Sequence, residues 1–260
     1  MTLSPVPRRA VILAAGLGTR LRPFTDERPK PLVEVHGVPI LHNALRNLAA
    51  VGVEHTTIVV GYRKEVIQRS YGVDFEGMRI SYAESSVFDR TGSAYSMWLA
   101  REALLEGDAF LLEGDVFFDV ETLKRLLSRN GDVAALDVFD ETMTGSAVVL
   151  SSHGAVTEFR MHQTAADLGR EPLYKTINIY RFTAATLRNA IVPRLDAWID
   201  NGGTKTYIEQ FLATLVADRS IDLQTSVCSD VRWFEIDSEA DLRTAERIFD
   251  LLRVPVPSAM

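Results

Sequence analysis

Apolar runs and amphipathic segments alternate along the first half of the chain. Buried strands of a parallel sheet are apolar on both faces, whereas surface helices repeat apolar residues every three or four positions. Strands are predicted at residues 9–15, 56–60, 78–83, 109–112 and 132–139. Helices are predicted at residues 37–51, 64–71, 93–105 and 120–127. This alternation favours an α/β fold, a single Rossmann-like three-layer domain with a mixed, mainly parallel central sheet.

The pattern changes after residue 140. Strand-like segments joined by short loops are typical of antiparallel additions to a sheet. They lie at residues 146–150, 156–160 and 174–182. The remaining predicted elements are helices at 186–200 and 206–218, a strand at 231–236 and a helix at 238–252. Ser93 and Ser238 are expected to cap the helices that start beside them.

One domain is therefore expected over residues 1–253, followed by a loose tail at 254–260. We expect its core at about 8–140 and 220–253, and a smaller antiparallel and helical lid insertion that binds an acceptor at about 141–219. The 260 residues are 47% hydrophobic, which is ordinary for a globular protein with a sizeable core.

Charge and cysteine content limit the possible partners. The net charge of −7 argues against nucleic acid as a partner. Between Arg8 and Lys30, six basic residues face two acidic ones, and this local excess of four positive charges favours a polyanion. The single Cys228 has no disulfide partner, which fits a cytoplasmic location. No apolar stretch approaches the roughly 20 residues of a membrane span, and Met1–Pro7 lacks the apolar core of a signal peptide.

A glycine-containing loop follows the first predicted strand. Gly16 and Gly18 interrupt the apolar run, and Arg20 and Lys30 follow. Unobstructed N–H groups and nearby cations are suited to phosphate oxygens, so we interpret this stretch as a nucleoside triphosphate loop. It is neither the dinucleotide fingerprint nor a Walker A sequence, because the third glycine and the Gly-Lys-Ser/Thr are missing. The alternative is a simple turn after a strand.

Two aspartates directly follow predicted strands. Asp115 comes after the 109–112 strand and Asp237 after the 231–236 strand. Two carboxylates at neighbouring strand ends can hold one Mg²⁺ together with phosphate oxygens. The alternative for each aspartate alone is a turn or helix-capping role. Glu113 and Glu235 lie two positions earlier and are expected to support the site or bind substrate.

These motifs resemble those of the sugar-phosphate nucleotidyltransferases. The resemblance rests on Leu13-Ala14-Ala15-Gly16-Leu17-Gly18-Thr19-Arg20 and Pro29-Lys30-Pro31-Leu32, and it extends over most of the chain. It implies that the nucleotide is bound by residues of the loop and by a later turn that contacts base and ribose. These residues are Leu13, Ala14, Ala15, Gly16, Gly18, Thr19, Arg20, Lys30, Gly92 and Ser93. It also implies that Asp115 and Asp237 are the metal ligands.

The second half resembles the phosphocholine and phosphonate cytidylyltransferase branch. The similar segments are Tyr174–Tyr180, Tyr207-Ile208-Glu209 and Trp233–Leu242. The resemblance implies that CMP is moved from CTP to a small phosphonate or phosphoalcohol, with release of pyrophosphate. Two alternatives stay open: a sugar-1-phosphate nucleotidyltransferase that uses UTP or dTTP, and an inactive regulatory module that binds nucleotide. A homodimer is also possible.

The expected roles follow from charge. The acceptor oxygen attacks the α-phosphorus in line, with Arg20 on the β- and γ-phosphates and Lys30 at the α-phosphate. Lys175 is a candidate for the acceptor's phosphonate. The candidate acceptor-binding residues are Glu113, Lys175, Asn178, Tyr180, Tyr207, Glu209 and Glu235. Tyr95, Trp98, Tyr180, Tyr207 and Trp233 either include a cage for a quaternary ammonium, with Glu209 as its counter-charge, or belong to the core.

Overall fold

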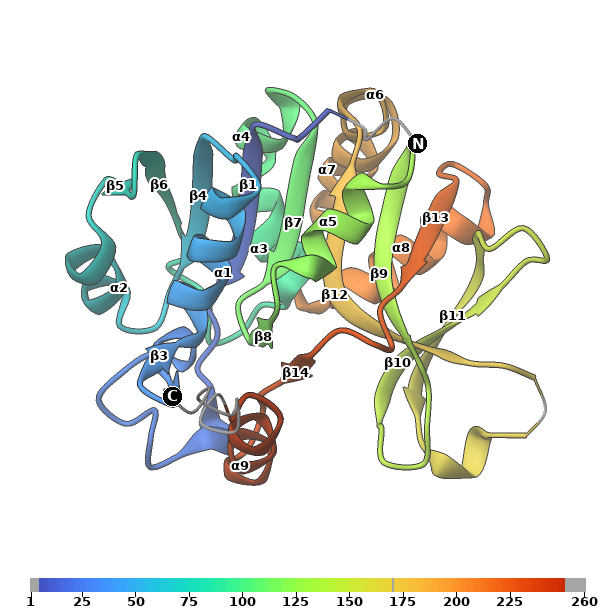
Figure 1. The fold of residues 1–260 in the computed structure, drawn as a ribbon. Coiled ribbons are helices and arrows are strands. Elements are labelled where there is room, and N and C mark those ends of the chain that lie inside the picture. Colours follow the sequence, from blue (N-terminus) through green and yellow to red (C-terminus); the bar gives the residue numbers. More distant parts are fainter. Residues whose placement is uncertain (1–4, 170, 251–260) are drawn as a thin grey trace, which may run out of the picture.

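A mixed ten-stranded sheet runs through the centre of the molecule (Figure 1). The computed structural model describes residues 5–169 and 171–250. Eight strands follow the order β11-β10-β12-β7-β1-β4-β6-β5, while β9 pairs with β12 and β13. The core strands β7, β1, β4 and β6 are parallel. Their bounds are Ala109–Glu113, Arg9–Ala14, His55–Val60 and Met78–Glu84.

Helices cover both faces of this sheet, so the predicted three-layer arrangement is confirmed. In Figure 1, α1 and α5 lie in front of the sheet and α3, α7 and α8 behind it. The first group packs in one core with Ile12 of β1, and the second group packs in the other core with Val11. Because successive residues of β1 serve opposite cores, the strand is apolar throughout. The helix bounds are Ile40–Ala50 (α1), Lys64–Tyr71 (α2), Ser93–Leu99 (α3), Arg101–Leu105 (α4), Glu121–Leu127 (α5), Ala184–Thr186 (α6), Val192–Asp200 (α7), Ile208–Ala217 (α8) and Glu239–Ile248 (α9).

The antiparallel part continues the main sheet. Strand β12 pairs with the core strand β7 through its second half and with β10 through its first residues. On its other edge it pairs with β9, and the register shifts between Thr176 and Tyr180. Asn178 lies within this shift and has a positive φ of 61°. The remaining bounds are Asp74–Phe75 (β5), Asp132–Val138 (β9), Gly145–Leu150 (β10), Val156–Gln163 (β11), Tyr174–Phe182 (β12) and Leu223–Val227 (β13).

Several predicted elements need correction. The helix expected at 93–105 is divided at Ala100 into α3 and α4. The helix expected at 186–200 contains a π-helical turn before α7, where Pro193 has no N–H to continue the regular pattern. Strand β13 was not predicted, because its short sequence includes the polar Gln224 and Ser226. Ser238 caps α9 as expected, whereas Gly92 and not Ser93 is the N-cap of α3.

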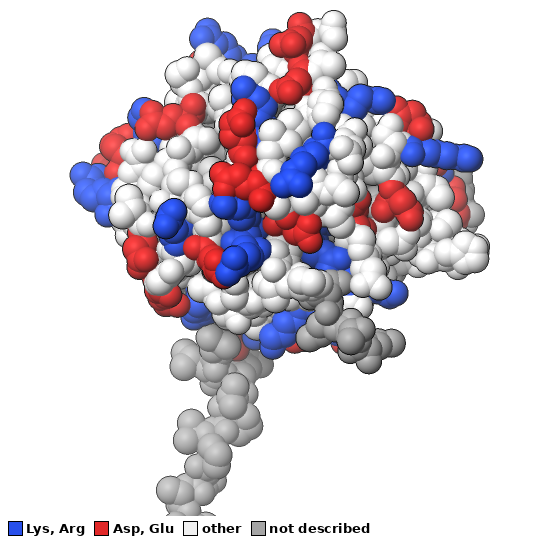
Figure 2. All heavy atoms as spheres, turned by 90° about the horizontal axis from the view of Figure 1, so that it is seen from above, with Lys and Arg blue, Asp and Glu red and all other residues white. Residues whose placement is uncertain are grey.

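The tail predicted at 254–260 lies outside the described residues. Among residues 5–169 and 171–250, no helix has the length and apolarity to cross a membrane. The face where β1 and β9 begin is seen from above in Figure 2, and its basic and acidic side chains are interspersed.

Candidate active site

The glycine loop after β1 brings Lys30 close to the end of that strand. Gly18 has φ = 62°, and a Cβ there would lie 2.7 Å from Cβ of Lys30. A side chain at this position would therefore meet both backbone strain and a steric clash. Gly16 is exposed, and a Cβ there would contact nothing within 4 Å. The loop thus combines one glycine that the packing requires with one that leaves open space.

Lys30 lies between the two strand-end aspartates. Its Nζ donates to Oδ2 of Asp115 at 2.8 Å and to Oδ1 of Asp237 at 2.7 Å. Arg20 lies 2.8 Å from the same Oδ1 of Asp237, although most of its side chain is exposed. We call Arg20, Lys30, Asp115 and Asp237 the lysine cluster. Four residues that are dispersed over more than 200 positions thus form one group, at the end of β1 and β7 where an open α/β sheet binds ligands.

Charge pairing dominates the titration of this cluster. Burial on its own would lower the pKa of the Lys30 ammonium, but Asp115 and Asp237 outweigh it and raise that pKa above its usual range. Burial likewise opposes the charge on Asp237, yet Lys30 and Arg20 hold the pKa of Asp237 below its usual value. The cluster is therefore built from charged groups.

Backbone contacts explain how the two aspartates meet. Gly114 donates its N–H to the carbonyl of Leu13 at 2.9 Å, and a Cβ on Gly114 would lie 2.7 Å from that oxygen. The turn that carries Asp115 therefore packs directly on the end of β1. Strand β8 (Val116–Phe118) pairs antiparallel with β14 (Trp233–Glu235), which brings Asp237 alongside.

Two carboxylates could hold a cation here. Asp115 and Asp237 converge on the point that the Lys30 ammonium occupies, and Oδ1 of Asp115 is buried without a hydrogen-bond partner. No group of three or more His, Cys, Asp or Glu side chains suited to a metal is found in the described part of the chain. Mg²⁺ commonly uses one or two carboxylates and takes its other ligands from phosphates and water, so this donor set fits it.

A second acidic group lies behind Asp115. Glu113 ends β7, Glu209 lies in the first turn of α8, and Asn178 and Tyr180 come from β12. We call these four residues the glutamate cluster. Oε1 of Glu113, Oδ1 of Asn178 and the hydroxyl of Tyr180 are all buried without a hydrogen-bond partner. Buried polar atoms are nearly always paired in native proteins, so three neighbouring exceptions call for an explanation.

The ionisable members of this cluster, Glu113, Glu209 and Tyr180, influence one another electrostatically. Burial raises the pKa of Glu113 well above its usual value, and the charges of Glu209, Asp115 and Glu235 raise it further. Burial also raises the pKa of the Tyr180 hydroxyl, with smaller effects of Glu209 and Glu113 in the same direction. Oγ of Ser93 accepts a hydrogen bond from the N–H of Ile208 at 2.9 Å, and Oγ of Ser146 donates to Oε1 of Glu209 at 3.1 Å. Ser146 was not predicted, since no sequence signal connects it with Glu209.

Lys175 forms a third group with Glu235. Its Nζ lies 3.0 Å from Oε2 of Glu235, and the lysine side chain is buried. Burial raises the pKa of Glu235, whereas the Lys175 charge acts in the opposite direction. Both residues were predicted to bind the acceptor, and the structure joins them in an ion pair. The pair lies beside the lysine cluster, because Glu235 precedes Asp237 by two residues.

Other predicted residues lie further from these groups or have structural contacts. Leu13, Ala14 and Ala15 are buried, and Thr19 is exposed beside Arg20. Gly92 packs so closely on the 204–206 backbone that a Cβ would lie 2.3 Å from the carbonyl of Thr206. Tyr207 is 60% exposed at the start of α8.

The aromatic residues fit the core alternative better than a cage. Tyr180 stacks on Phe182 at 5.8 Å, and the Arg101 guanidinium covers the ring of Trp98 at 4.2 Å. Tyr95 packs against Trp98, and Trp233 donates its ring N–H to Asp137. Four of the five rings are thus engaged inside the fold.

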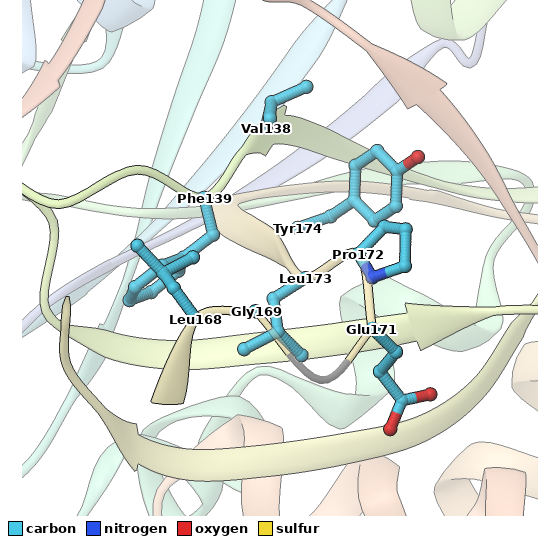
Figure 3. A pocket seen from close by; sticks show the side chains of 8 residues that line it. All are labelled: Val138, Phe139, Leu168, Gly169, Glu171, Pro172, Leu173 and Tyr174. Carbon is cyan, nitrogen blue, oxygen red and sulfur yellow. The ribbon is translucent and has the colours of Figure 1, made fainter. Parts of the chain in front are cut away.

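An apolar groove of about 420 Å³ lies apart from both clusters (Figure 3). Its side chains come from the end of β9 and from the segment before β12, and they include Phe139, Leu168 and Leu173. None of the predicted site residues lines it. Its shape and chemistry are unrelated to a site for phosphates.

Comparison with known proteins identifies the family of this chain. The chain is 34% identical over 247 residues to the CMP-5'-(3-aminopropyl)phosphonate synthase of Streptomyces rubellomurinus. The matched region covers 94% of this chain but only 39% of that protein. It is 24% identical to the 2-aminoethylphosphonate cytidylyltransferase of Lancefieldella rimae, over 90% of this chain and 89% of that one. Among solved structures, the CTP:phosphocholine cytidylyltransferase of Streptococcus pneumoniae has the same fold, with a TM-score of 0.71 and 22% identity over 92% of this chain and 98% of that one. Residues 9–148 match the nucleotidyl transferase family, and the chain therefore belongs to that family.

Proposed function

We propose that this chain transfers CMP from CTP to a small phosphonate or phosphoalcohol and releases pyrophosphate. The lysine cluster is the observation that carries the proposal, because it places two cations and two carboxylates at the end of the glycine loop. The relatives support the choice of CTP and of a phosphonate. Both are named for the transfer of a cytidylyl group to an aminoalkylphosphonate, and both match 90% or more of this chain, including its second half.

The reaction needs positioning and charge neutralisation more than proton transfer. An oxygen lone pair of the acceptor's phosphonate or phosphate forms a bond to the α-phosphorus of CTP. The bond from that phosphorus to the bridging oxygen breaks, and its electron pair leaves with pyrophosphate. The attacking oxygen is already anionic, so no general base is required. Since two anions must approach each other, cations near the α-phosphate lower the barrier.

The residues of the lysine cluster divide this task. Lys30 stabilises the charge that develops at the α-phosphate, and the exposed Arg20 holds the β- and γ-phosphates. Asp115 and Asp237 would hold Mg²⁺, which supplies positive charge to the phosphate oxygens when it is bound. Lys175 binds the acceptor's phosphonate after it is released from Glu235. The backbone of Gly16 and Gly18 binds phosphate oxygens, and the turn at Gly92 and Ser93 contacts the nucleoside.

The broader organisation belongs to the same proposal. Residues 141–219 would bind the acceptor, and the core around β1 and β7 would bind the nucleotide. The enzyme would act in the cytoplasm on small molecules, with Mg²⁺ as its metal and a homodimer as its possible assembly.

Pyrophosphate release tests the proposal. The purified chain is mixed with Mg²⁺ and each of CTP, UTP, dTTP and GTP, together with phosphonates, phosphocholine or sugar 1-phosphates. We expect release with CTP and a small phosphonate or phosphoalcohol. Release only with UTP or dTTP and a sugar 1-phosphate would replace the cytidylyl assignment with the sugar-nucleotide one. Calorimetric binding of CTP without release under any condition would favour an inactive nucleotide-binding module.

A further inference from the structure

The glutamate cluster has hydrogen-bond acceptors but no internal cation. Asn178, Tyr180 and Glu209 are only 2%, 1% and 7% exposed. Asn178 and Tyr180 each have a side-chain oxygen without a partner, as does Glu113. No basic residue within 5–169 or 171–250 forms an ion pair with Glu113 or Glu209, whereas Asp115 and Asp237 share Lys30. Buried hydrogen-bond acceptors are costly to leave without a donor, and a cationic donor would both pair these atoms and suit the neighbouring carboxyl groups.

We propose that the glutamate cluster binds a primary ammonium group at the far end of the acceptor, and that it rejects a trimethylammonium group. This inference rests on the proposed function, since it concerns the acceptor of the same reaction. An ammonium with N–H bonds donates to Glu113, Asn178 and Tyr180, which are the three unpaired acceptors. A quaternary ammonium has no N–H and would leave all three unpaired.

The backbone around the cluster supports a built site. Asn178 adopts a left-handed conformation at the register shift of β12, which is uncommon outside glycine. Glu209 is held by Ser146 and lies at the N-terminus of the ten-residue helix α8, where the helix dipole favours a negative charge. The cluster therefore has fixed acceptor positions that do not depend on rearrangement of a loop.

The position of the cluster limits the length of the acceptor. Glu113 precedes Asp115 by two residues, so their Cα atoms are at most about 7 Å apart. Both side chains are only partly buried, so neither is sealed off from solvent. A molecule that places its phosphonate at the lysine cluster and its nitrogen at Glu113 needs only a short alkyl chain.

Ring contacts argue against the quaternary alternative. A trimethylammonium group is normally bound by the open faces of several aromatic rings. Tyr180 is stacked on Phe182, and Trp98 already has a cation on its face. The available chemistry at the cluster is thus hydrogen bonding and negative charge.

Matched pairs of acceptors test the inference. Phosphoethanolamine and phosphocholine differ only in N-methylation, and 2-aminoethylphosphonate and ethylphosphonate differ only in the amine. We expect kcat/KM for pyrophosphate release from CTP to be at least about 100-fold higher for the amine of each pair, because a site built for N–H donors strongly rejects analogues that lack them. Calorimetric titration of the same acceptors into the protein measures binding without turnover.

Three variants locate the preference. Asn178→Gly keeps the left-handed backbone but removes Oδ1, Tyr180→Phe removes only the hydroxyl, and Glu209→Gln removes the charge. Each should reduce the preference for the amine about tenfold, the effect of one hydrogen bond, without changing KM for CTP. Glu121→Gln is the matched control, because Glu121 is an exposed first-turn glutamate of α5. It should leave the preference unchanged.

The outcomes separate this inference from the proposed function. Equal use of phosphocholine and phosphoethanolamine with CTP would overturn the ammonium site and leave the cytidylyl transfer intact. Selective binding of the amines without pyrophosphate release from CTP would overturn the transfer and retain the site. An unchanged preference in all three variants would show that the amine is recognised elsewhere.

Discussion

The lysine cluster and the glutamate cluster differ in how their buried carboxyl groups are paired. Both contain carboxylates that the fold withdraws from water at the end of β7. In the lysine cluster, Lys30 lies between Asp115 and Asp237 and neutralises them. In the glutamate cluster, Glu113 and Asn178 retain unpaired oxygens, and the described residues supply no cation.

Because of this difference, the two clusters would accept a cation in different ways. A neutralised cluster must release its own cation before another can enter, so Lys30 would compete with the proposed metal for the same carboxylate oxygens. A cluster without an internal cation could accept one directly from the proposed acceptor. Under the proposed function, the ligand-free chain pairs its carboxylates where the acceptor would react and leaves polar atoms unpaired where the acceptor's far end would lie.

Removing a carboxylate from the lysine cluster should have the largest effect. Asp115→Asn and Asp237→Asn each keep the shape of the side chain but remove a charge that pairs with Lys30 and that would bind the proposed Mg²⁺. We expect kcat for pyrophosphate release to fall about a thousandfold or more, because metal stabilisation contributes several kcal/mol. Asp119→Asn, at an aspartate that pairs with Arg232 outside the cluster, should retain activity. Near wild-type turnover in either cluster variant would remove that residue from the metal site.

Replacing Lys30 should lower the rate of turnover but raise the affinity for a metal ion. Lys30→Met should lower kcat roughly 10²–10³-fold, the usual cost of one electrostatic contact in a transition state. The same variant should bind Mn²⁺ at least about tenfold more tightly in the absence of nucleotide, or about 1.4 kcal/mol, since the competing ammonium is gone. Titration of free Mn²⁺ measures this without turnover. Lys64→Met, which breaks an ion pair with Glu84 elsewhere, is the control. Unchanged metal affinity would mean that Lys30 does not occupy the metal position.

A substitution of Lys175 tests how the acceptor is bound and should have a smaller effect than those in the lysine cluster. Lys175→Gln should raise KM for the acceptor about 10- to 100-fold with little change in KM for CTP, because one charged hydrogen bond to the phosphonate is lost. The single variant also leaves Glu235 without its partner. The double variant Lys175→Gln/Glu235→Gln should recover thermal stability but not KM, whereas recovery of both would assign Lys175 a purely structural role. Lys124→Gln, on the exposed side of α5, is the matched control.

The sequence was informative where chemistry depends on consecutive residues. The glycine loop, the strands β1 and β7 and the position of Asp115 directly after β7 all follow from local patterns. The two-residue spacing between Glu113 and Asp115 likewise predicts that both belong to one end of the sheet. Family membership and a mixed sheet with parallel core strands could therefore be expected before the structure was known.

Features that depend on distant segments could not be read in this way. The bridge from Lys30 to Asp237 joins residues 207 positions apart, and Ser146 meets Glu209 across 63 positions. Asn178 has a left-handed backbone where the pairing of β12 with β9 shifts register, and no local sequence pattern marks that position. Strand β13 was missed because its pairing with β9, rather than its own apolar pattern, makes it a strand.

Asp132 is a third buried carboxylate and serves as a reference for both clusters. Its substitution should have the smallest effect of those considered. Asp132 starts β9 at the opposite end of the sheet and accepts hydrogen bonds from N–H of Thr183 at 2.7 Å and from the hydroxyl of Thr186 at 2.6 Å. Burial raises its pKa above the usual value, and these hydrogen bonds only partly oppose that shift. Asp132 is thus paired by neutral donors, without the ligand dependence that we assign to Glu113.

The contribution of Asp132 to the free energy of unfolding should depend on pH. The folded state binds the Asp132 proton more tightly than the unfolded state does, so between the usual aspartate pKa and the raised one the folded state carries more protons. The free energy of unfolding must therefore fall as pH rises through that interval. Asp132→Asn should be less stable than wild type by about 1 kcal/mol at low pH, from imperfect hydrogen bonding, and the difference should shrink as pH rises. Urea unfolding from pH 3.5 to 7 measures it, with the exposed Asp222→Asn as control. A stability difference that is independent of pH would mean that Asp132 titrates alike in both states, so that its hydrogen bonds fully offset its burial.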